Sequence, residues 1–381
     1  MEPFKTASKF LHAALLAAWA AVSCTPSSTG LPAWAIGPFV RPETGNPVIQ
    51  PRPDLSFTCP MSGEEVRWAE GATFNPAATL VGDQIAVLFR SEDDLRQGIG
   101  TRTSRLGLAL SEDGIRMQVE PAPVLYPDED GQKENEWPGG CEDPRVAVTE
   151  DGMYVCLYTQ WNRKCPRLSV ATSKDLHTWT KHGPAFAKAY GGKFKDISTK
   201  SASIVTERTK GRLVIHRFGK ESAVGGPYIM YWGEAFVNVA VSENLIDWTP
   251  LVDERGELLK VMEPRDGFFD SHLTECGPPA IWTPRGIVLI YNGKNRHGER
   301  RDPAVSPDAY CPGEALFDRK DPTRLLERLD TPILQPEADF ERTGQYAAGT
   351  IFSEGLVYRK GKWYLYYGCA DSRVGVAICS R

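Results

Sequence analysis

Short runs of apolar or alternating residues recur along most of the chain, and turn-forming residues separate them. No amphipathic helical period persists over a long segment. The clearest runs are bounded by Gly, Pro, Asp or Asn, and they lie at 84–89, 106–110, 154–158, 213–217, 236–241, 287–291 and 362–367. Runs of this length with turn signals between them are typical of strands. The pattern therefore predicts an all-β protein.

A weak internal repeat indicates which all-β architecture. The form S-x-x-L-x-x-W occurs at 173–179 and 242–248, each time after a run that contains Val-Ala. Ser111-Glu-Asp-Gly114 follows Gly-Leu-Ala-Leu in the same way, without the tryptophan. Units that recur at intervals of roughly 60–70 residues favour propeller blades of about four strands, and the chain has room for about five. We therefore expect a five-bladed β-propeller with a central active-site pocket; an irregular pair of β-sandwiches is the alternative.

The N-terminal residues have the features of a targeting segment. A positive region with Lys5 and Lys9 precedes an apolar stretch at 10–22, which is too short to span a bilayer comfortably. Ala-Val-Ser-Cys24 then resembles a bacterial lipobox, and it predicts lipidation of Cys24 after removal of a signal peptide at 1–24. An ordinary signal-peptidase site at 18–20 is the alternative, and it would give a soluble secreted protein.

This interpretation divides the chain into three parts. Residues 1–24 are the lipoprotein signal peptide, 25–54 are a polar tether and N-terminal extension, and 55–381 are the catalytic propeller. We expect an exported protein, in the periplasm or on the outer membrane of a Gram-negative bacterium. Contact with the membrane would then be through the lipid anchor alone.

Charge and cysteine usage exclude several classes of partner and cofactor. The formal net charge is -5 without long charged runs, so nucleic acid is not an expected partner. Beyond Cys24, eight cysteines remain, with no C-x-x-C pair, and several lie in apolar runs where a buried free thiol is usual. The six histidines form no metal-ligand pattern. We expect neither a metal nor an organic cofactor.

The segment Gly-Gly-Cys-Glu-Asp-Pro-Arg at 139–145 is the strongest local candidate for a functional site. Its glycines and proline define a tight turn, and two adjacent carboxylates and an arginine lie at the start of a strand-like run. Charged groups gathered at the mouth of a strand suit a ligand site. A hairpin corner with solvated charges is the alternative.

Taken in order, the motifs resemble those of glycoside hydrolase family 130. They are Asn-Pro-Ala at 75–77, Phe-Arg at 89–90, Gly-Cys-Glu-Asp-Pro-Arg at 140–145, Gly-Pro-Pro at 277–279, Tyr-Asn-Gly at 291–293 and Tyr-Tyr-Gly-Cys-Ala-Asp at 366–371. The resemblance covers roughly 55–381 and implies a five-bladed propeller acting on β-mannosides. It implies that Asp143 lies at the base of the pocket against the non-reducing mannose. It also implies that the neighbours of that sugar are Asn75, Arg90, Arg145 and Asp371.

Departures from the family's phosphorylases point to its hydrolases. Phosphorylases carry a Tyr-His-Gly segment whose histidine helps to hold phosphate, and this chain has Asn292 in that place. It also carries Glu275 ahead of Gly-Pro-Pro, and Glu234 in Tyr-Trp-Gly-Glu. This pair resembles the glutamates of the β-1,2-mannosidase branch. Lys200, His216 and Arg217 count against this interpretation, since they offer positive charge to an anion.

The chemistry of inversion agrees with this assignment. An inverting glycosidase needs one protonated acid and one carboxylate that activates water, about 6.5–9.5 Å apart. We therefore predict Glu234, Glu275 and Asp143 as catalytic residues, and Asn75, Arg90, Arg145, Lys200, Arg217, Asn292 and Asp371 as substrate-binding residues. Which glutamate is acid and which is base stays open, as does proton transfer from Asp143 through a sugar hydroxyl.

The predicted activity is inverting hydrolysis of β-mannosidic bonds in a β-mannoside oligosaccharide, and β-1,2 is the linkage we expect. A β-mannoside phosphorylase on the same fold is the first alternative. A surface lipoprotein that binds carbohydrate without turnover is the second, and three carboxylates in one pocket argue against it.

Overall fold

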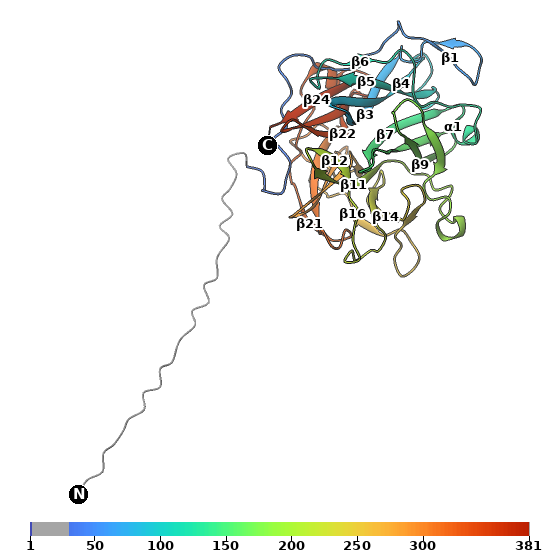
Figure 1. Cartoon of the computed structure of the whole chain (residues 1–381). Helices are drawn as coiled ribbons and strands as arrows, with labels where there is room; N and C mark the ends of the chain where they lie inside the picture. Colours follow the sequence, from blue (N-terminus) through green and yellow to red (C-terminus); the bar gives the residue numbers. More distant parts are fainter. Residues whose placement is uncertain (2–29, 381) are drawn as a thin grey trace. The chain divides into compact units, whose positions relative to one another are not determined.

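The computed structural model describes Met1 and residues 30–380, and almost all of the regular structure there is β-strand (Figure 1). The helical elements are single turns: α1 (Lys133–Glu136), η1 (Ala189–Gly192) and α2 (Asp339–Arg342). The prediction of an all-β protein is thus confirmed. Each of the seven runs that the sequence singled out lies in, or overlaps, a strand. Within the described residues no helix is long and apolar enough to cross a membrane.

In the described part of the chain, most strands fall into five consecutive antiparallel groups. The first group consists of β3 (Ala72–Val81), β4 (Gln84–Glu92), β5 (Ser104–Ser111) and β6 (Gln118–Val119). The second group consists of β7 (Gly140–Val148), β8 (Tyr154–Trp161), β9 (Pro166–Ser173) and β10 (Thr180–Pro184). The third is β11 (Ala202–Thr209), β13 (Tyr228–Trp232), β14 (Val237–Ser242) with β15 (Trp248–Pro250).

The fourth group has a divided first strand, made of β17 (Leu273–Cys276) and β18 (Ala280–Thr283), because Gly-Pro-Pro interrupts it. Both parts pair with β19 (Gly286–Lys294), followed by β20 (Tyr310–Phe317) and β21 (Leu325–Arg328). The fifth group is β22 (Ile351–Arg359), β23 (Lys362–Cys369) and β24 (Arg373–Cys379). The remaining short strands are β1 (Phe57–Thr58), β2 (Glu65–Val66), β12 (Arg212–Ile215) and β16 (Lys260–Met262).

The sequence repeat corresponds to a repeated turn that joins the last two strands of a group. In both tryptophan-containing copies the serine hydroxyl accepts a hydrogen bond from the leucine N–H at 2.9 Å, and the indole donates to the leucine carbonyl at 3.0 or 3.1 Å. In the third copy, Ser111 Oγ accepts from the N–H of Gly114 at 2.8 Å. The leucines and Gly114 all have positive φ. The three copies are therefore structurally equivalent turns.

The strands β3, β7 and β22 lie side by side in the middle of the fold (Figure 1). Each carries a β-bulge, between Phe74 and Pro76, Glu142 and Arg145, and Ser353 and Gly355 respectively. A bulge re-aims the side chain of the extra residue. The residues so displaced include Asn75, Asp143 and Glu354. The backbone of Asn75 and Asp143 is left-handed, with φ of 47° and 48°.

Residues 34–49 lie along the free edge of β24. Val40 exchanges backbone hydrogen bonds with Ile378, at 2.9 and 2.8 Å, and Ile49 forms a bridge with Val374. The amide of Asn46 bonds both the carbonyl and the N–H of Val376. This segment thus continues the fifth group beyond its last strand.

Two buried glutamates, Glu314 and Glu341, hold this N-terminal segment. Glu314 accepts a hydrogen bond from the backbone N–H of Ile36 at 3.0 Å, and Glu341 accepts from Arg41 at 2.7 and 2.9 Å. The eight cysteines of the described chain are free thiols, and all but Cys165 are buried.

Candidate active site

A pocket of about 340 Å³, here called the central pocket, lies at the first halves of strands that include β3, β7 and β22. Its lining includes two basic side chains, Arg90 and Lys200, and six carboxylates: Glu92, Glu142, Asp143, Glu234, Glu275 and Asp371. Aromatic side chains complete the wall: Phe74, Trp161, Tyr310, Tyr346 and Phe352. Carboxylates for proton transfer beside apolar ring faces are what a carbohydrate-active site needs.

Asp143 is held at the base of the central pocket by three partners. Asn75 Nδ2 donates to Oδ1 at 2.8 Å, and Arg90 Nη1 donates to the same oxygen at 3.1 Å. Lys200 Nζ lies 3.9 Å from Oδ2. Burial alone would raise the pKa of Asp143, but Arg90 and Lys200 outweigh it and hold that pKa well below its usual range. Asp143 is therefore ionised in the free protein.

Glu142, the next residue along the chain, behaves in the opposite way. Arg90 Nη2 lies 2.9 Å from its carboxylate, and Ser104 Oγ donates at 3.2 Å. Burial nevertheless raises the pKa of Glu142 to about 7, with Asp143 adding to the rise. Burial also raises the pKa of Asp371, on the same wall, to about 6. The pocket thus combines a fixed anion with carboxyl groups that hold protons near neutral pH.

Glu234 and Glu275 line the central pocket together with Lys200. Lys200 Nζ is 3.8 Å from Glu234 Oε2 and 3.9 Å from Asp143 Oδ2, so both carboxylates lie beside the same ammonium group. Ser201 Oγ donates to Glu275 at 2.5 Å. Burial raises the pKa of Glu275 to about 7 against the pull of Lys200 and Arg145. Glu234 keeps 37% of its side chain exposed, whereas Glu275 is buried.

Arg145 lies beneath the pocket and does not line it. Its guanidinium donates to the carbonyls of Asp143 and Cys276 at 3.0 and 2.9 Å, and it lies 2.9 Å from Glu354 on β22. Arg145 therefore ties β7 to β17 and β22. Glu354 is completely buried, and burial raises its pKa well above the usual range. Glu354 was not among the predicted site residues. The feature that could have indicated it is a charged residue, followed by glycine, inside an apolar run.

Two further predicted substrate-binding residues, Asn292 and Arg217, also lie outside the pocket lining. The Asn292 amide is buried and makes three bonds to Ser353: Oδ1 accepts from its N–H and Oγ at 2.8 and 2.9 Å, and Nδ2 donates to its carbonyl at 3.0 Å. Arg217 is exposed and donates to the Tyr228 hydroxyl at 3.1 Å. His216 is stacked on Trp282 at 4.7 Å. Lys200 is thus the one member of the basic trio that lines the pocket.

Other lining residues escaped the sequence analysis because they lie on loops or second strands. Glu92 accepts hydrogen bonds from Arg90 at 2.7 Å and from Arg102 at 2.7 Å, although the two arginines are twelve positions apart. Tyr310 and Tyr346 pack edge-to-face, with ring centroids 5.6 Å apart. No local motif marks these residues, since pairing between distant strands brings them together.

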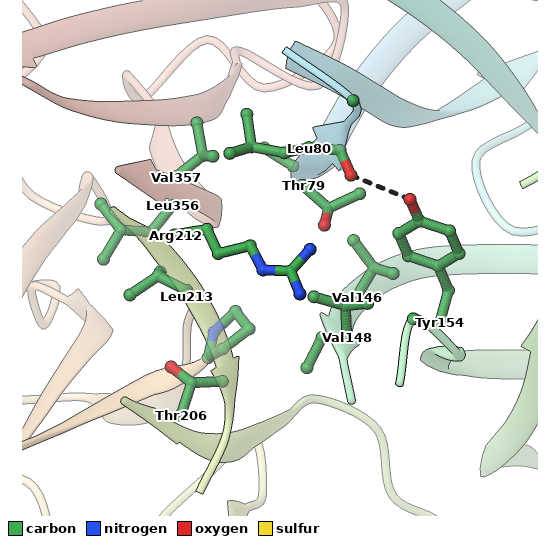
Figure 2. A pocket seen from close by; sticks show the side chains of 15 residues that line it. Thr79, Leu80, Val146, Val148, Tyr154, Thr206, Arg212, Leu213, Leu356 and Val357 are labelled. Carbon is green, nitrogen blue, oxygen red and sulfur yellow. Dashed lines mark hydrogen bonds between the residues drawn. The ribbon is translucent and has the colours of Figure 1, made fainter. Parts of the chain in front are cut away.

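A second, smaller cavity of about 110 Å³ lies at the other ends of the same strands (Figure 2). Aliphatic side chains such as Val146, Leu356 and Val357 dominate its wall, and the Tyr154 hydroxyl donates to the Leu80 carbonyl at 2.9 Å. No carboxylate lines this cavity. It lacks the groups for acid–base chemistry, so the candidate active site is the central pocket.

An all-β fold with acid–base carboxylates around a central pocket defines a glycosidase-like class of enzyme. A family model described as "beta-1,4-mannooligosaccharide phosphorylase" (Glyco_hydro_130) matches residues 49–381. The chain belongs to glycoside hydrolase family 130. It is 30% identical over 323 residues to a "1,2-beta-oligomannan phosphorylase" of Thermoanaerobacter sp. (strain X514), covering 84% of this chain and 93% of that protein.

Solved structures of higher identity share the same fold. One is a glycosyl hydrolase from Bacteroides ovatus, at 58% identity and a TM-score of 0.88, covering 91% of this chain and 95% of that one. Another, at 57% identity and a TM-score of 0.88 with the same coverage, was presented under the words "The GH130 family of mannoside phosphorylases contains glycoside hydrolases that target beta-1,2 mannosidic linkages in Candida mannan".

Proposed function

We propose that this protein hydrolyses β-mannosidic bonds, with β-1,2 as the linkage, and that it inverts the anomeric configuration. One observation carries the proposal: Glu234 and Glu275 line the same pocket as Lys200 and Asp143. Water would attack the anomeric carbon while the glycosidic C–O bond breaks. One carboxylate takes the proton of the water, and the leaving oxygen receives a proton from a carboxyl group or through a sugar hydroxyl.

Electrostatics favour water over phosphate as the nucleophile. Burial alone would lower the pKa of Lys200, but Glu275, Asp143 and Glu234 raise it, so its charge is already balanced by carboxylates. A phosphate dianion beside a glutamate would meet repulsion of ~4 kcal/mol per unit charge at about 4 Å and an effective dielectric of about 20. A neutral water meets no such penalty.

Asn292 supplies independent support for hydrolysis. It stands where the phosphorylases of the family carry a histidine that helps to hold phosphate. Its amide hydrogen bonds go to Ser353 instead, so β19 is joined to β22 and the amide is not offered to an anion. Together with the exposed position of Arg217, this leaves Lys200 and Arg90 as the basic groups on the pocket wall.

The relatives support the substrate class and leave the nucleophile to experiment. The curated relative at 30% identity is named a phosphorylase, whereas the solved structure at 57% identity was presented with hydrolases that target β-1,2 linkages. The greater similarity favours the hydrolase. A phosphorylase remains the competing outcome of the test below.

We also propose that each of the five antiparallel groups is one blade of a propeller. The equivalent turns at 111–114, 173–179 and 242–248 support this, since they recur at the same place in successive groups. The first strands of the groups would then surround the central pocket, consistent with the origin of Asn75, Asp143 and Glu275 on β3, β7 and β17.

The test is incubation of the purified protein with β-1,2-mannobiose, with and without millimolar phosphate. We expect free mannose as the sole sugar product, released first as the α-anomer, at a rate that phosphate leaves unchanged. Mannose-1-phosphate as the main product would contradict the proposed hydrolase and show that the protein is a phosphorylase. Proton NMR of the nascent anomer distinguishes inversion from retention.

A further inference from the structure

A third hollow, distinct from the smaller cavity described above, adjoins the central pocket. It has a volume of about 510 Å³, and we call it the side groove. Leu95, Ile99, Arg102, Gln345 and Arg373 are among its lining residues. Ile99 and Gln345 also line the central pocket, so the two spaces adjoin at these residues.

The loop that carries Leu95 and Ile99 is fixed in place by a buried arginine. Arg102 donates from Nε to the carbonyl of Gln97 at 3.0 Å and from Nη2 to the carbonyl of Leu95 at 3.4 Å. Its Nη1 bonds Glu92 at 2.7 Å and also bonds Gln345 Oε1. Because Glu92 bonds Arg90 in turn, the loop and the site of Asp143 are joined by one chain of ionic contacts.

Gln345 forms the wall that the groove and the pocket share. Its Nε2 donates to the carbonyl of Asp371 at 2.5 Å, and its backbone N–H bonds Ser372 Oγ at 3.0 Å. Leu95 and Ile99 are 47% and 69% exposed, among the few large apolar side chains that the described chain leaves exposed. The groove therefore offers both aliphatic surface and hydrogen-bonding groups.

We propose that the side groove is an outer subsite for mannosyl residues beyond the two that flank the scissile bond. This inference rests on the proposed function, since it assumes a β-mannoside in the central pocket. A pyranose presents C–H faces to aliphatic side chains and hydroxyls to Arg, Gln and Thr, the composition found here. The volume lies within the range of about 300–1,000 Å³ that small-molecule sites occupy. The substrate class is accordingly an oligosaccharide of three or more units.

The test compares kcat/KM on β-1,2-mannobiose, mannotriose and mannotetraose. For the wild type we expect an increase of at least about fivefold from the disaccharide to the longer substrates, because remote binding energy lowers the barrier. The double variant Leu95→Ala/Arg373→Ala, at two residues that line the side groove and not the central pocket, should lose most of that increase and keep its activity on mannobiose. Leu326→Ala is the matched control, since Leu326 is 40% exposed on β21, outside both linings.

Equal kcat/KM for all lengths in the wild type, or equal losses for all lengths in the double variant, would overturn the outer subsite while leaving hydrolysis intact. A second measurement does not depend on turnover. Calorimetry on Glu275→Gln should show tighter binding of mannotetraose than of mannobiose, and the added Leu95→Ala/Arg373→Ala changes should remove the difference. Equal affinity for the two sugars would also refute the subsite, whatever reaction the protein catalyses.

Discussion

Glu142 and Asp143 are adjacent, buried and bound to the same arginine, yet their pKa values move in opposite directions. The difference lies in the additional partners. Asp143 receives Asn75 and has Lys200 nearby, whereas Glu142 gains mainly Arg90 and a serine hydroxyl. Two like charges this close favour a state in which one is neutral. Arg90, Lys200 and Arg145, with a smaller contribution from Asn75, thus keep the negative charge on Asp143.

Glu234 and Glu275 are the residues whose loss should separate chemistry from folding. We expect Glu234→Gln and Glu275→Gln each to lower kcat on β-1,2-mannobiose by a factor on the order of 10²–10⁴, since a group for proton transfer is removed. Glu263→Gln is the control, because Glu263 is exposed with a side chain 61% accessible. A variant with near wild-type kcat would exclude that glutamate from the mechanism.

The raised pKa of Glu275 also has a consequence for stability. Since the folded pKa is about 7 and the ordinary value is 4.5, the protonated carboxyl stabilises the fold fully at low pH, and that stabilisation is lost as the pH rises through about 7. Glutamine mimics the protonated form. Glu275→Gln should therefore raise Tm relative to the wild type by on the order of 2 °C or more at about pH 8, and much less at about pH 5.

Thermal unfolding of both proteins at the two pH values checks this expectation, with Glu263→Gln again as the control. A difference in Tm that is the same at both pH values would show that the carboxyl of Glu275 does not titrate in the neutral range.

At the scale of the strand, the bulges explain what the sequence allowed us to predict and what it concealed. The apolar runs revealed the strands, and Asp143 stood out because Gly-Gly and Pro surround it. Glu354 occupies the corresponding bulge of β22 but lies in an ordinary strand pattern, and only the pairing of β22 with β23 shows the extra residue. Arg217 was misleading because the strand β12 ends at Ile215, two residues before this arginine, although the apolar run in the sequence extends to 217.

Gly368 on β23 tests whether a neighbouring strand positions the pocket. A Cβ atom there would lie 2.4 Å from Asn75 Oδ1 and 3.0 Å from its backbone nitrogen. Gly368→Ala should therefore displace the amide that bonds Asp143 and reduce kcat/KM by about tenfold or more, because small displacements of positioned groups are costly in catalysis. Gly131→Ala is the control, since a Cβ atom there has no neighbour within 4 Å. Unchanged kinetics of a folded Gly368→Ala protein would contradict the positioning role.

At the scale of the molecule, we propose that the protein is exported and anchored by a lipid on Cys24, a residue that lies outside the described part of the chain. We expect Cys24→Ala to move the protein from the membrane fraction to the soluble fraction without loss of activity. Stable attachment requires more than one acyl chain, as in bacterial lipoproteins. Fractionation followed by N-terminal sequencing is the measurement, and a soluble wild type that begins at residue 21 would refute the anchor.

The pairing of Val40 and Asn46 with β24 sets the order in which the chain can fold. These contacts join positions more than three hundred residues apart, so they close the longest loop in the described structure and cannot form until the final strand has been synthesised. During synthesis the segment before the first strands has no partner. The export proposed above would bring such a chain to the translocation machinery with residues 40–49 unpaired, and its last sheet would then be completed only on the far side of the membrane.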